Sequence, residues 1–328
     1  MIISVDVGNG YTKAISEYGR KIIFPSVMAY VGEKKLDIGK SLNYVLKITY
    51  NEKTEIVAIG EAAKKDAKIS YMTFNEERYN EEIGIFLTLA GIYLTGGNDE
   101  EEVELGLGLP ISIYRTKKND IIQTYNNLEA EVEGENMPKK KIKIKNVYVM
   151  PQGLSAIYSI NEQIPTEGKM GIVDIGYYTT DYTLLECKPN ELTPLRSYSD
   201  SLRVGISDAA ELVAQKFAEI TKQHSLDLSR AQTIYEEGKV FYKGVEYDLT
   251  KHKEEARKKI ANIIRGGIAS KWEDELTYVK KLYLVGGGAS ELYNSMKEII
   301  PQAELIHDPQ FANAKGYLEY IKKAKAIL

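Results

Sequence analysis

The sequence has almost none of the residues that build covalent cross-links or zinc centres. Its only cysteine is Cys187, so an intramolecular disulfide and a multi-cysteine zinc cluster are both excluded. The histidines, His224, His252 and His307, are scattered without the spacing of a metal site. We therefore expect a cytoplasmic protein, from a reducing compartment, in which zinc chemistry has no part.

Long hydrophobic runs and a strong excess of one charge are also missing. The apolar run at residues 1–7 is too short for a secretory signal or a membrane span, and is typical of a first strand. A net charge of −4 gives no general attraction for nucleic acid or for anionic membranes. Residues 139–149 alternate lysine with branched apolar residues, as a solvent-facing strand does. We expect neither direct nucleic-acid binding nor membrane binding.

A length of 328 residues is enough for two compact domains, since a single core usually stops growing near roughly 250 to 300 residues, although one very large domain is also compatible with it. Residues 1–16 predict a strand, a glycine turn and a second strand. A dinucleotide-binding turn is disfavoured, because the residues after the glycines favour a strand rather than a helix. Residues 22–30 predict another strand, interrupted by Pro25, and residues 33–60 predict a small β-rich appendage.

Helices and strands then alternate along the chain. Residues 83–94 are almost continuously apolar and have helical length, which predicts a buried helix. Residues 103–109 predict a strand that stops at a proline, and residues 113–125 predict a helix. Another helix is expected to open at residues 151–153 and to continue to residue 160.

An internal duplication divides the chain. Residues 170–185 repeat the plan of residues 1–16, in which an apolar strand, an Asp-x-Gly turn and a second strand follow one another. A repeat of this kind suggests two domains of like topology. We expect a first domain formed by residues 1–156 and 309–328, and a second domain formed by residues 157–308.

The second domain is expected to be rich in helices. Residues 202–220 and 251–271 have helical spacing of apolar residues. Residues 282–292 predict a strand, a triple-glycine turn and a helix opened by Ser290. Such a turn suits an anion or a ribose.

Three motifs occur in an informative order. An Asp-x-Gly-x-Gly with a lysine lies at residues 6–13, an Asp-x-Gly-x-x-Thr-Thr-Asp at residues 174–181, and a Val-Gly-Gly-Gly at residues 285–288. Each motif alone is weak, because glycine turns often serve only tight backbone geometry. In this order they resemble phosphate loop one, phosphate loop two and the adenosine loop of the actin-like ATPases.

The resemblance covers nearly the whole chain. It is strongest to the plasmid-segregation actins of the ParM type and to archaeal actin-like proteins, which share Phe24-Pro25-Ser26 and the segment Gln310-Phe311-Ala312-Asn313. It implies an α/β fold with two actin-like (ribonuclease H-like) domains around a nucleotide cleft, with small insertions. The sequence departs from the family at Tyr177-Tyr178, where phosphate loop two usually has smaller residues.

The motif residues have chemistry that suits a phosphate site. Gly8 and Gly10 allow backbone N–H groups to turn toward phosphate oxygens, and Lys13 can add a positive charge. Asp6 and Asp174, one from each domain, can hold a hydrated Mg²⁺ through its waters. Without that pairing, each aspartate would only cap a turn.

Gln152 is uncharged and so cannot be a strong base, but it can orient an attacking water. We therefore expect Gln152, Asp6 and Asp174 to be the catalytic residues. Thr179 and Thr180 offer hydroxyl and N–H groups to phosphates, and the resemblance suggests Glu211 near the ribose or base. The expected nucleotide-binding residues are Gly8, Asn9, Gly10, Tyr11, Lys13, Gly176, Thr179, Thr180, Glu211, Gly286, Gly287 and Gly288.

The resemblance implies an ATPase that uses ATP or GTP with Mg²⁺ and forms nucleotide-dependent filaments. The expected partner is therefore a second copy of the chain, with a DNA-binding adaptor for plasmid segregation. A sugar kinase of the same fold would need an acceptor motif, and none is evident. A nucleotide-dependent regulator that does not polymerise stays open as an alternative, since a nucleotide cleft alone does not prove hydrolysis.

Overall fold

A computed structural model of the chain describes residues 1–31, 44–66, 71–72, 79–97, 100–134, 137–160, 164–189, 191–222 and 228–326. The chain forms two compact units. Unit 1 comprises Met1–Ser159 and Phe311–Leu328, and unit 2 comprises Ile160–Gln310. The chain therefore leaves unit 1 once and returns to it once.

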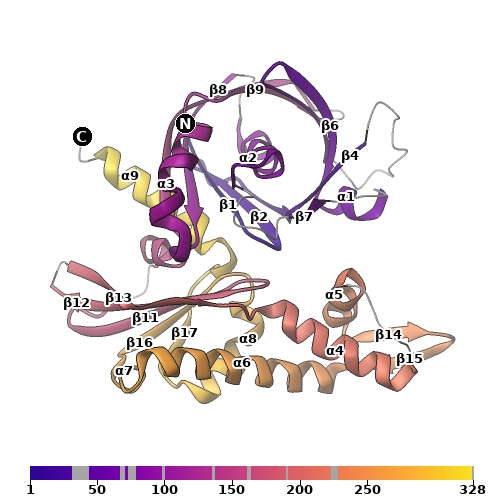
Figure 1. Cartoon of the computed structure of the whole chain (residues 1–328), viewed down its shortest axis with the longest axis vertical. Coiled ribbons are helices and arrows are strands. Elements are labelled where there is room, and N and C mark those ends of the chain that lie inside the picture. The colour runs from indigo at the N-terminus through magenta and orange to yellow at the C-terminus, as the bar shows by residue number, and fades with distance from the viewer. Residues whose placement is uncertain are drawn as a thin grey trace. The chain divides into compact units, whose positions relative to one another are not determined.

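Unit 1 is built on a ten-stranded sheet with the order β3-β2-β1-β8-β10-β9-β5-β6-β4-β7. Its strands are β1 (Ile2–Val7), β2 (Tyr11–Ser16), β3 (Lys21–Pro25), β4 (Val27–Tyr30), β5 (Val45–Tyr50), β6 (Lys53–Ile59), β7 (Tyr71–Met72), β8 (Glu100–Leu109), β9 (Glu129–Gly134) and β10 (Lys140–Pro151). The sheet curves around helix α2 (Glu82–Thr95), and a short helix, α1 (Glu61–Asp66), lies outside it (Figure 1).

Helix α2 is buried almost all round, as its apolar sequence predicts. The hydroxyls of Thr88 and Thr95 donate to carbonyls one turn back, so these polar groups are satisfied inside the core. At its C-terminal end, Lys140 Nζ donates to the carbonyls of Tyr93 (3.1 Å) and Gly96 (2.9 Å). The buried lysine thus caps the helix where the dipole favours a cation.

Strands β1, β8 and β10 run parallel, so their carboxyl ends lie at one edge of the sheet. Helix α3 (Ile111–Tyr125) follows β8, and the 3-10 helix η2 (Leu154–Ser159) follows β10. Helix α9 (Ala312–Ala326) packs against η2 and the three parallel strands. Buried Tyr317 and Ile321 of α9 meet Ile2 of β1 in a small apolar cluster. The returning C-terminal segment therefore covers the central strands of unit 1.

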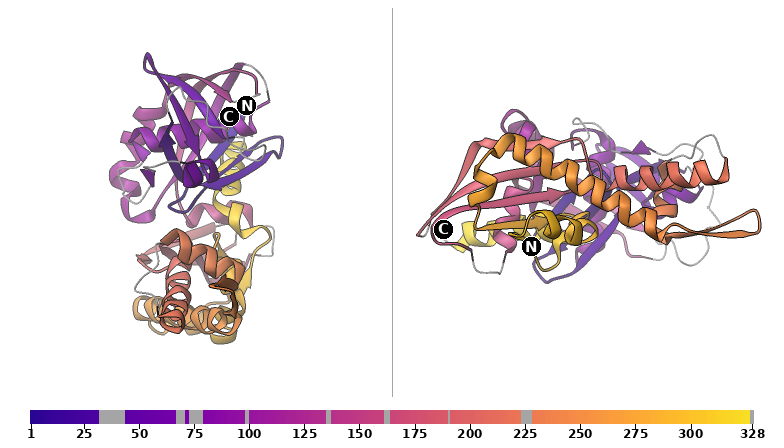
Figure 2. Two further views of the ribbon diagram at one scale, coloured as in Figure 1. Left: turned by 90° about the vertical axis from the view of Figure 1, so that its right-hand side faces the viewer. Right: turned by 90° about the horizontal axis from the view of Figure 1, so that it is seen from below.

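Unit 2 has a five-stranded sheet with the order β13-β12-β11-β16-β17. Its strands are β11 (Gly168–Ile175), β12 (Thr180–Lys188), β13 (Glu191–Leu202), β16 (Lys281–Val285) and β17 (Ala303–Leu305). Its helices are α4 (Ile206–Thr221), α5 (Leu228–Glu237), α6 (Thr250–Trp272), α7 (Glu275–Tyr278), α8 (Ala289–Ile299) and the 3-10 helix η3 (Pro309–Phe311), which ends on the first residue of the returning segment. The hairpin β14 (Lys239–Tyr242) and β15 (Val245–Asp248) precedes α6, which leads from it to α7 (Figures 1 and 2).

The expected duplication has a structural counterpart. Strand β1 pairs with β2 antiparallel and with β8 parallel, and β11 pairs with β12 antiparallel and with β16 parallel. The core of unit 2 joins these strands to α4, α6 and α8 through residues such as Val213, Ile264 and Leu292. Each unit thus places a two-stranded hairpin beside a parallel neighbour.

The prediction that residues 33–60 form a small β-rich appendage is right about the strands in the described part, residues 44–60, but wrong about an appendage. Strand β5 pairs with β9, with Ile48 opposite Val132, so β5 and β6 continue the main sheet. Ile48 and Val132 are fully buried in the main core. Residues 32–43 lie outside the described part of the chain.

The helix expected from residue 151 to residue 160 is also wrong. Strand β10 continues through Pro151, and only the short helix η2 follows. Gly153 has φ of +70°, which is incompatible with a right-handed helix at that residue. Residues 157–159 stay in unit 1, beyond the expected boundary, because η2 packs against α9.

The expected helix opening at Ser290 is also displaced. Helix α8 begins after Gly288, so Ser290 lies inside the helix instead of capping it.

Candidate functional site

The first motif places a buried carboxylate beside a lysine. Asp6 of β1 lies directly opposite Lys13 of β2, because the two strands pair in antiparallel register. Asp6 is only 4% exposed, and Lys13 Nζ lies 3.4 Å from its Oδ2. The intervening turn is closed by Gly8 N, which donates to the carbonyl of Tyr11 (3.2 Å). The carbonyl of Gly10 accepts from Ser26 N, which ties the turn to the start of β4.

Gln152 joins this pair from the end of β10. Its side chain is buried, and Nε2 donates to Asp6 Oδ1 (3.1 Å) and to Tyr79 Oη (3.2 Å). The backbone holds the residue firmly, since Gln152 N donates to the carbonyl of Leu109 (2.7 Å). The next amide, Gly153 N, donates to Asn313 Oδ1 (2.9 Å) at the start of α9. The structure therefore brings Asp6, Lys13 and Gln152 together at one edge of the sheet.

In unit 2 the corresponding hairpin carries two carboxylates. Asp174 of β11 lies opposite Asp181 of β12, and each is 7% exposed. The turn between them is closed by Gly176 N, which donates to the carbonyl of Thr179 (2.8 Å). The first amides of α4 are used within the protein, since Ser207 N donates to the carbonyl of Tyr177 (2.9 Å).

The triple-glycine loop lies next to this turn. Gly288 N donates to the carbonyl of Ile175 (2.8 Å), and Gly286 N donates to the carbonyl of Pro309 (2.8 Å). Gly286 has φ of +91°, which disfavours any residue with a Cβ. A Cβ at this position would also overlap Asp174 Oδ1 and lie 2.5 Å from the carbonyl oxygen of Ile175. Unit 2 thus places Asp174, the turn at residues 176–179 and the glycine loop in contact.

The bulky residues of the second turn pack on each other. The rings of Tyr177 and Tyr178 meet edge to face, with their centroids 4.5 Å apart. Burial, and secondly the negative charge of Glu211 on α4, raise the pKa of Tyr178 to about 12. Tyr178 is therefore protonated at neutral pH. The influence of Glu211 indicates that this exposed residue lies near the turn.

The two predicted threonines differ in their surroundings. Thr180 is fully buried, and its hydroxyl donates to the carbonyl of Val204 (2.8 Å), so its one hydroxyl proton is already used. Thr179 is partly exposed at the turn. Of the two hydroxyls, that of Thr179 is the better placed to donate to a bound anion.

The donor set suits Mg²⁺ better than a metal that requires a protein cage. Among the described residues, no group of three or more His, Cys, Asp or Glu side chains is arranged to hold a metal. Asp6 and Asp174 are hard oxygen donors, each the predicted carboxylate of its own unit. Mg²⁺ commonly keeps several waters and binds one or two carboxylates together with substrate phosphates. Taken separately, the carboxylate of each unit therefore has the chemistry of a ligand that a hydrated Mg²⁺ accepts.

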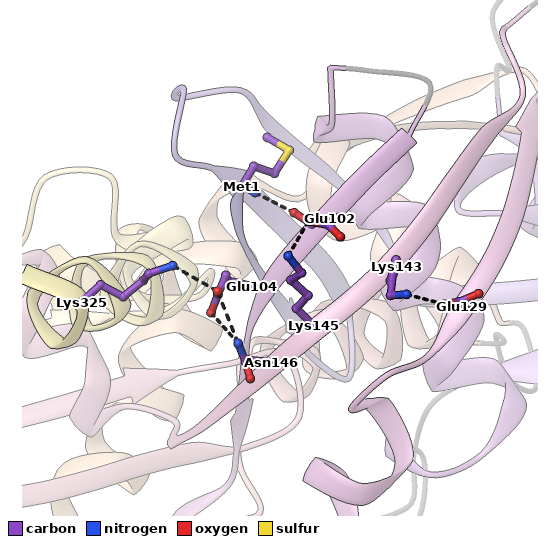
Figure 3. Close-up of polar contacts among 8 residues, drawn as sticks. All are labelled: Met1, Glu102, Glu104, Glu129, Lys143, Lys145, Asn146 and Lys325. Carbon is purple, nitrogen blue, oxygen red and sulfur yellow. Dashed lines mark hydrogen bonds and ion pairs between the residues drawn. The ribbon is translucent and has the colours of Figure 1, made fainter. Parts of the chain in front are cut away.

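The lysine-rich strand β10 forms ion pairs instead of a bare basic face. Lys143 pairs with Glu129 (2.8 Å) and Lys145 with Glu102 (2.5 Å), as Figure 3 shows. The hydrogen bond from Lys143 holds the pKa of Glu129 below its usual range. These exposed pairs neutralise lysines that would otherwise attract a polyanion.

The same region ties the two ends of the chain to β8. The N-terminal amine of Met1 donates to the carbonyl of Glu102 (2.6 Å), and Lys325 of α9 pairs with Glu104 (3.0 Å; Figure 3).

Among the described helices, none is both long enough and apolar enough to cross a bilayer.

Several site residues were missed by the sequence analysis. Tyr79 lies in a short segment just before α2 and carries no motif. Asn313 belongs to the C-terminal motif but received no role. Asp181 could have been found, because it follows Asp174 by the spacing that separates Lys13 from Asp6.

Two family models match the chain. Residues 4–154 match the model for the N-terminal domain of actin-like proteins, and residues 172–298 match the model for the C-terminal domain of the archaeal, MreB-like actin homologue. Together they cover every residue predicted for the site, from Asp6 to Gln152 in unit 1 and from Asp174 to Gly288 in unit 2.

The chain is similar over nearly its whole length to known proteins. The chain is 25% identical, over 99% of both chains, to an archaeal actin homolog of Thermoplasma acidophilum. It is 25% identical to the subunit of a 15-stranded ParM filament from Clostridium botulinum, with a TM-score of 0.86 over 98% of this chain and 99% of that chain. An archaeal actin homolog in complex with ADP is 23% identical, with a TM-score of 0.81 over the same shares of the two chains.

Proposed function

We propose, since this chain belongs to the actin-like proteins, that it binds and hydrolyses a nucleoside triphosphate with Mg²⁺ and assembles into filaments as it does so. The observation that carries the proposal is the group formed by buried Asp6 and Gln152, at the carboxyl ends of β1 and β10, with Lys13 of β2. Ligands of open α/β sheets bind at the carboxyl ends of the strands.

In unit 1, the proposed role of the first turn is to bind phosphate. Gly8 N closes the turn, so the backbone N–H groups proposed for phosphate are those of Asn9 and Gly10, and Lys13 adds a positive charge close to them. Gln152 Oε1 can accept a hydrogen bond from a water and orient it for attack on the terminal phosphate. Asp6 holds both Lys13 and Gln152 in place, and can also hold Mg²⁺ through water.

In unit 2, the proposed role of the second turn and the glycine loop is also to bind nucleotide. Asp174 can hold the ion through water, and the hydroxyl of Thr179 can donate to a phosphate. Gly286 allows the backbone to pass directly over Asp174. The presence of ADP in a structurally similar archaeal actin homolog supports a nucleotide as the ligand.

The proposed assembly has a role in DNA or plasmid segregation in the cytoplasm, as the similarity to a ParM filament suggests. The chain has a net charge of −4, and lysines of its most basic strand are paired with glutamates. Contact with DNA is therefore assigned to a separate DNA-binding adaptor protein.

The first prediction concerns assembly. We expect the protein to sediment as polymer with triphosphate, and the critical concentration to be about 5- to 150-fold higher with diphosphate, the usual range of coupling between two sites. The reason is that a ligand which favours the assembling conformation must itself be bound more tightly by the polymer. Pelleting across protein concentration with ATP, GTP, ADP and a slowly hydrolysed analogue gives these values.

Equal critical concentrations with all four nucleotides would remove the nucleotide switch from the proposal. Nucleotide hydrolysis with no polymer at any concentration would favour the regulator that does not polymerise. The same series shows whether ATP or GTP is preferred.

The second prediction tests the glycine loop. Gly286→Ala should weaken nucleotide binding by about 10-fold, because strain of roughly 1 to 3 kcal/mol at a positive φ displaces the loop from Asp174. The matched control is Gly244→Ala, because Gly244 has a similar φ of +82° in the β14–β15 turn, where a Cβ would have no atom within 4 Å, and it is not among the predicted nucleotide-binding residues. Binding of a fluorescent nucleotide measures both variants. Equal affinities for the two variants would show that the loop does not contact the nucleotide.

A further inference from the structure

We infer that Tyr79 is a positioning residue, whose hydroxyl fixes the orientation of the Gln152 carboxamide for the attacking water. The inference rests on the proposed hydrolytic function. Tyr79 Oη lies 3.2 Å from Gln152 Nε2, and Tyr79 is only 2% exposed. The hydroxyl is thus a buried partner of the proposed water-orienting group.

The orientation of the amide follows from its partners. Asp6 Oδ1 belongs to a carboxylate that accepts hydrogen bonds, so the Gln152 atom 3.1 Å away must be the nitrogen. A carboxamide nitrogen has two N–H groups, and here one is directed to Asp6 and the other to Tyr79. Both donors are therefore used within the protein, which leaves Oε1 as the atom available to a water.

Tyr79 is itself held in place from α2 and α3. The hydroxyl of Tyr125 donates to the carbonyl of Tyr79 (3.0 Å) and lies 3.3 Å from the hydroxyl of Thr88. The neighbouring Asn80 accepts from Thr124 Oγ1 (2.9 Å). Buried Tyr125 thus anchors the backbone of Tyr79, and Thr124 anchors the side chain of the next residue, so the tyrosine is held in one position and its hydroxyl can act as a fixed acceptor.

Loss of the hydroxyl would leave one N–H of Gln152 without its partner. The bond to Asp6 would keep the nitrogen on the correct side, but the amide plane could then turn about that single hydrogen bond. Oε1 would spend less time directed at the water. We expect kcat to fall while nucleotide affinity stays unchanged, since the group acts on the water in the transition state.

The test is Tyr79→Phe, which keeps the ring and removes only the hydroxyl. We expect kcat to fall about 10-fold, at the low end of the effect of a positioned catalytic group, with the dissociation constant of ATP unchanged. Tyr93→Phe is the matched control, because Tyr93 is equally buried in unit 1 but bonds to Pro138 and Gly134, away from Gln152. Equal losses of kcat in the two variants would assign Tyr79 to structure alone.

A double-mutant cycle gives a second measure. If Tyr79 acts through Gln152, Tyr79→Phe should have no further effect on kcat in a Gln152→Ala background. Additive effects of the two substitutions would overturn the inference.

A third readout does not depend on hydrolysis. In protein labelled with ¹⁵N-glutamine, the side-chain amide signal of Gln152 is the one lost in Gln152→Ala. Its protons should exchange with water several-fold faster in Tyr79→Phe than in the unmodified protein or in Tyr93→Phe. Unchanged exchange would overturn the positioning role even if hydrolysis were normal. Absence of hydrolysis in the unmodified protein, with faster exchange in the variant, would instead remove the proposed function and keep the contact.

Discussion

Replacing Gly316 by alanine should lower the midpoint of thermal unfolding of unit 1 by roughly 6 to 12 °C. Helix α9 and helix η2 approach each other through their backbones at this residue. A Cβ at Gly316 would overlap the carbonyl oxygen of Ser155 and lie 2.7 Å from its carbonyl carbon and 3.2 Å from Ala156 Cα. Backbone atoms cannot rotate away, so the helices must separate. Overpacking of this kind destabilises by about 3 kcal/mol, which in a unit of this size shifts Tm by about 2 to 4 °C per kcal/mol.

The control is Gly266→Ala, also in a helix, where a Cβ would have no other atom within 4 Å. Alanine should stabilise helix α6 there by roughly 0.5 to 1 kcal/mol, because glycine has more freedom to lose on folding. Scanning calorimetry of both variants and the unmodified protein makes the comparison. If Gly316→Ala unfolded at the same temperature as the unmodified protein, the close contact of α9 with η2 would be disproved.

A second large effect is expected for Asp6→Asn, which should reduce the rate of triphosphate hydrolysis by about 100-fold. The substitution keeps the size of the side chain and one oxygen that can accept from Gln152 Nε2. It removes the negative charge that lies beside Lys13 and that is proposed to hold Mg²⁺. Loss of a charged group that supports the ion removes several kcal/mol of transition-state stabilisation, and about 2.7 kcal/mol corresponds to 100-fold. The fold should persist, because no core volume is lost.

The measurement is phosphate release at saturating nucleotide and Mg²⁺, together with circular dichroism of the variant. Asp200→Asn is the control, since Asp200 is exposed on β13 and forms a surface ion pair with Lys271 (3.2 Å). A surface pair of this kind contributes little, so the control should hydrolyse normally. If Asp6→Asn hydrolysed at the unmodified rate, phosphate loop one would have to be placed elsewhere.

Much of the architecture could be predicted because it depends on local patterns. The actin-like resemblance and the two-domain fold are confirmed by the two family models and by the similarity to solved structures. The buried helix α2 was predicted from an apolar run, and the lysine strand from its alternation. The hairpins of β1–β2 and β11–β12 were predicted because strands and glycine turns have strong short-range signals.

The predictions that were wrong concern segments whose structure depends on contacts between residues far apart in the sequence. Nothing near Ile48 indicates that β5 pairs with β9, some eighty residues further along the chain. The segment after Pro151 was expected to be a helix, but Gln152 N bonds to Leu109 and Gly153 N to Asn313, which hold the chain in a different path. Tertiary contacts such as these override local propensity.

Dependence on tertiary contacts also explains why Tyr79 was not predicted as a site residue, since only its contact with Gln152 distinguishes it. The sequence contains 24 tyrosines, and no local pattern separates this one from the rest. Gln152 was identified because it stands between Pro151 and Gly153, directly after a recognisable strand, whereas its partner comes from a segment without a motif. A residue that positions another becomes visible only when the two side chains are placed in space.

The two hairpins share one backbone plan, yet the cross-strand partner of the first aspartate is Lys13 in unit 1 and Asp181 in unit 2. One copy therefore presents opposite charges side by side, and the other presents two buried carboxylates. The same backbone frame therefore carries a compensated charge in unit 1 and two neighbouring carboxylates in unit 2. A change at one register position is enough to give two hairpins of the same plan different electrostatic character.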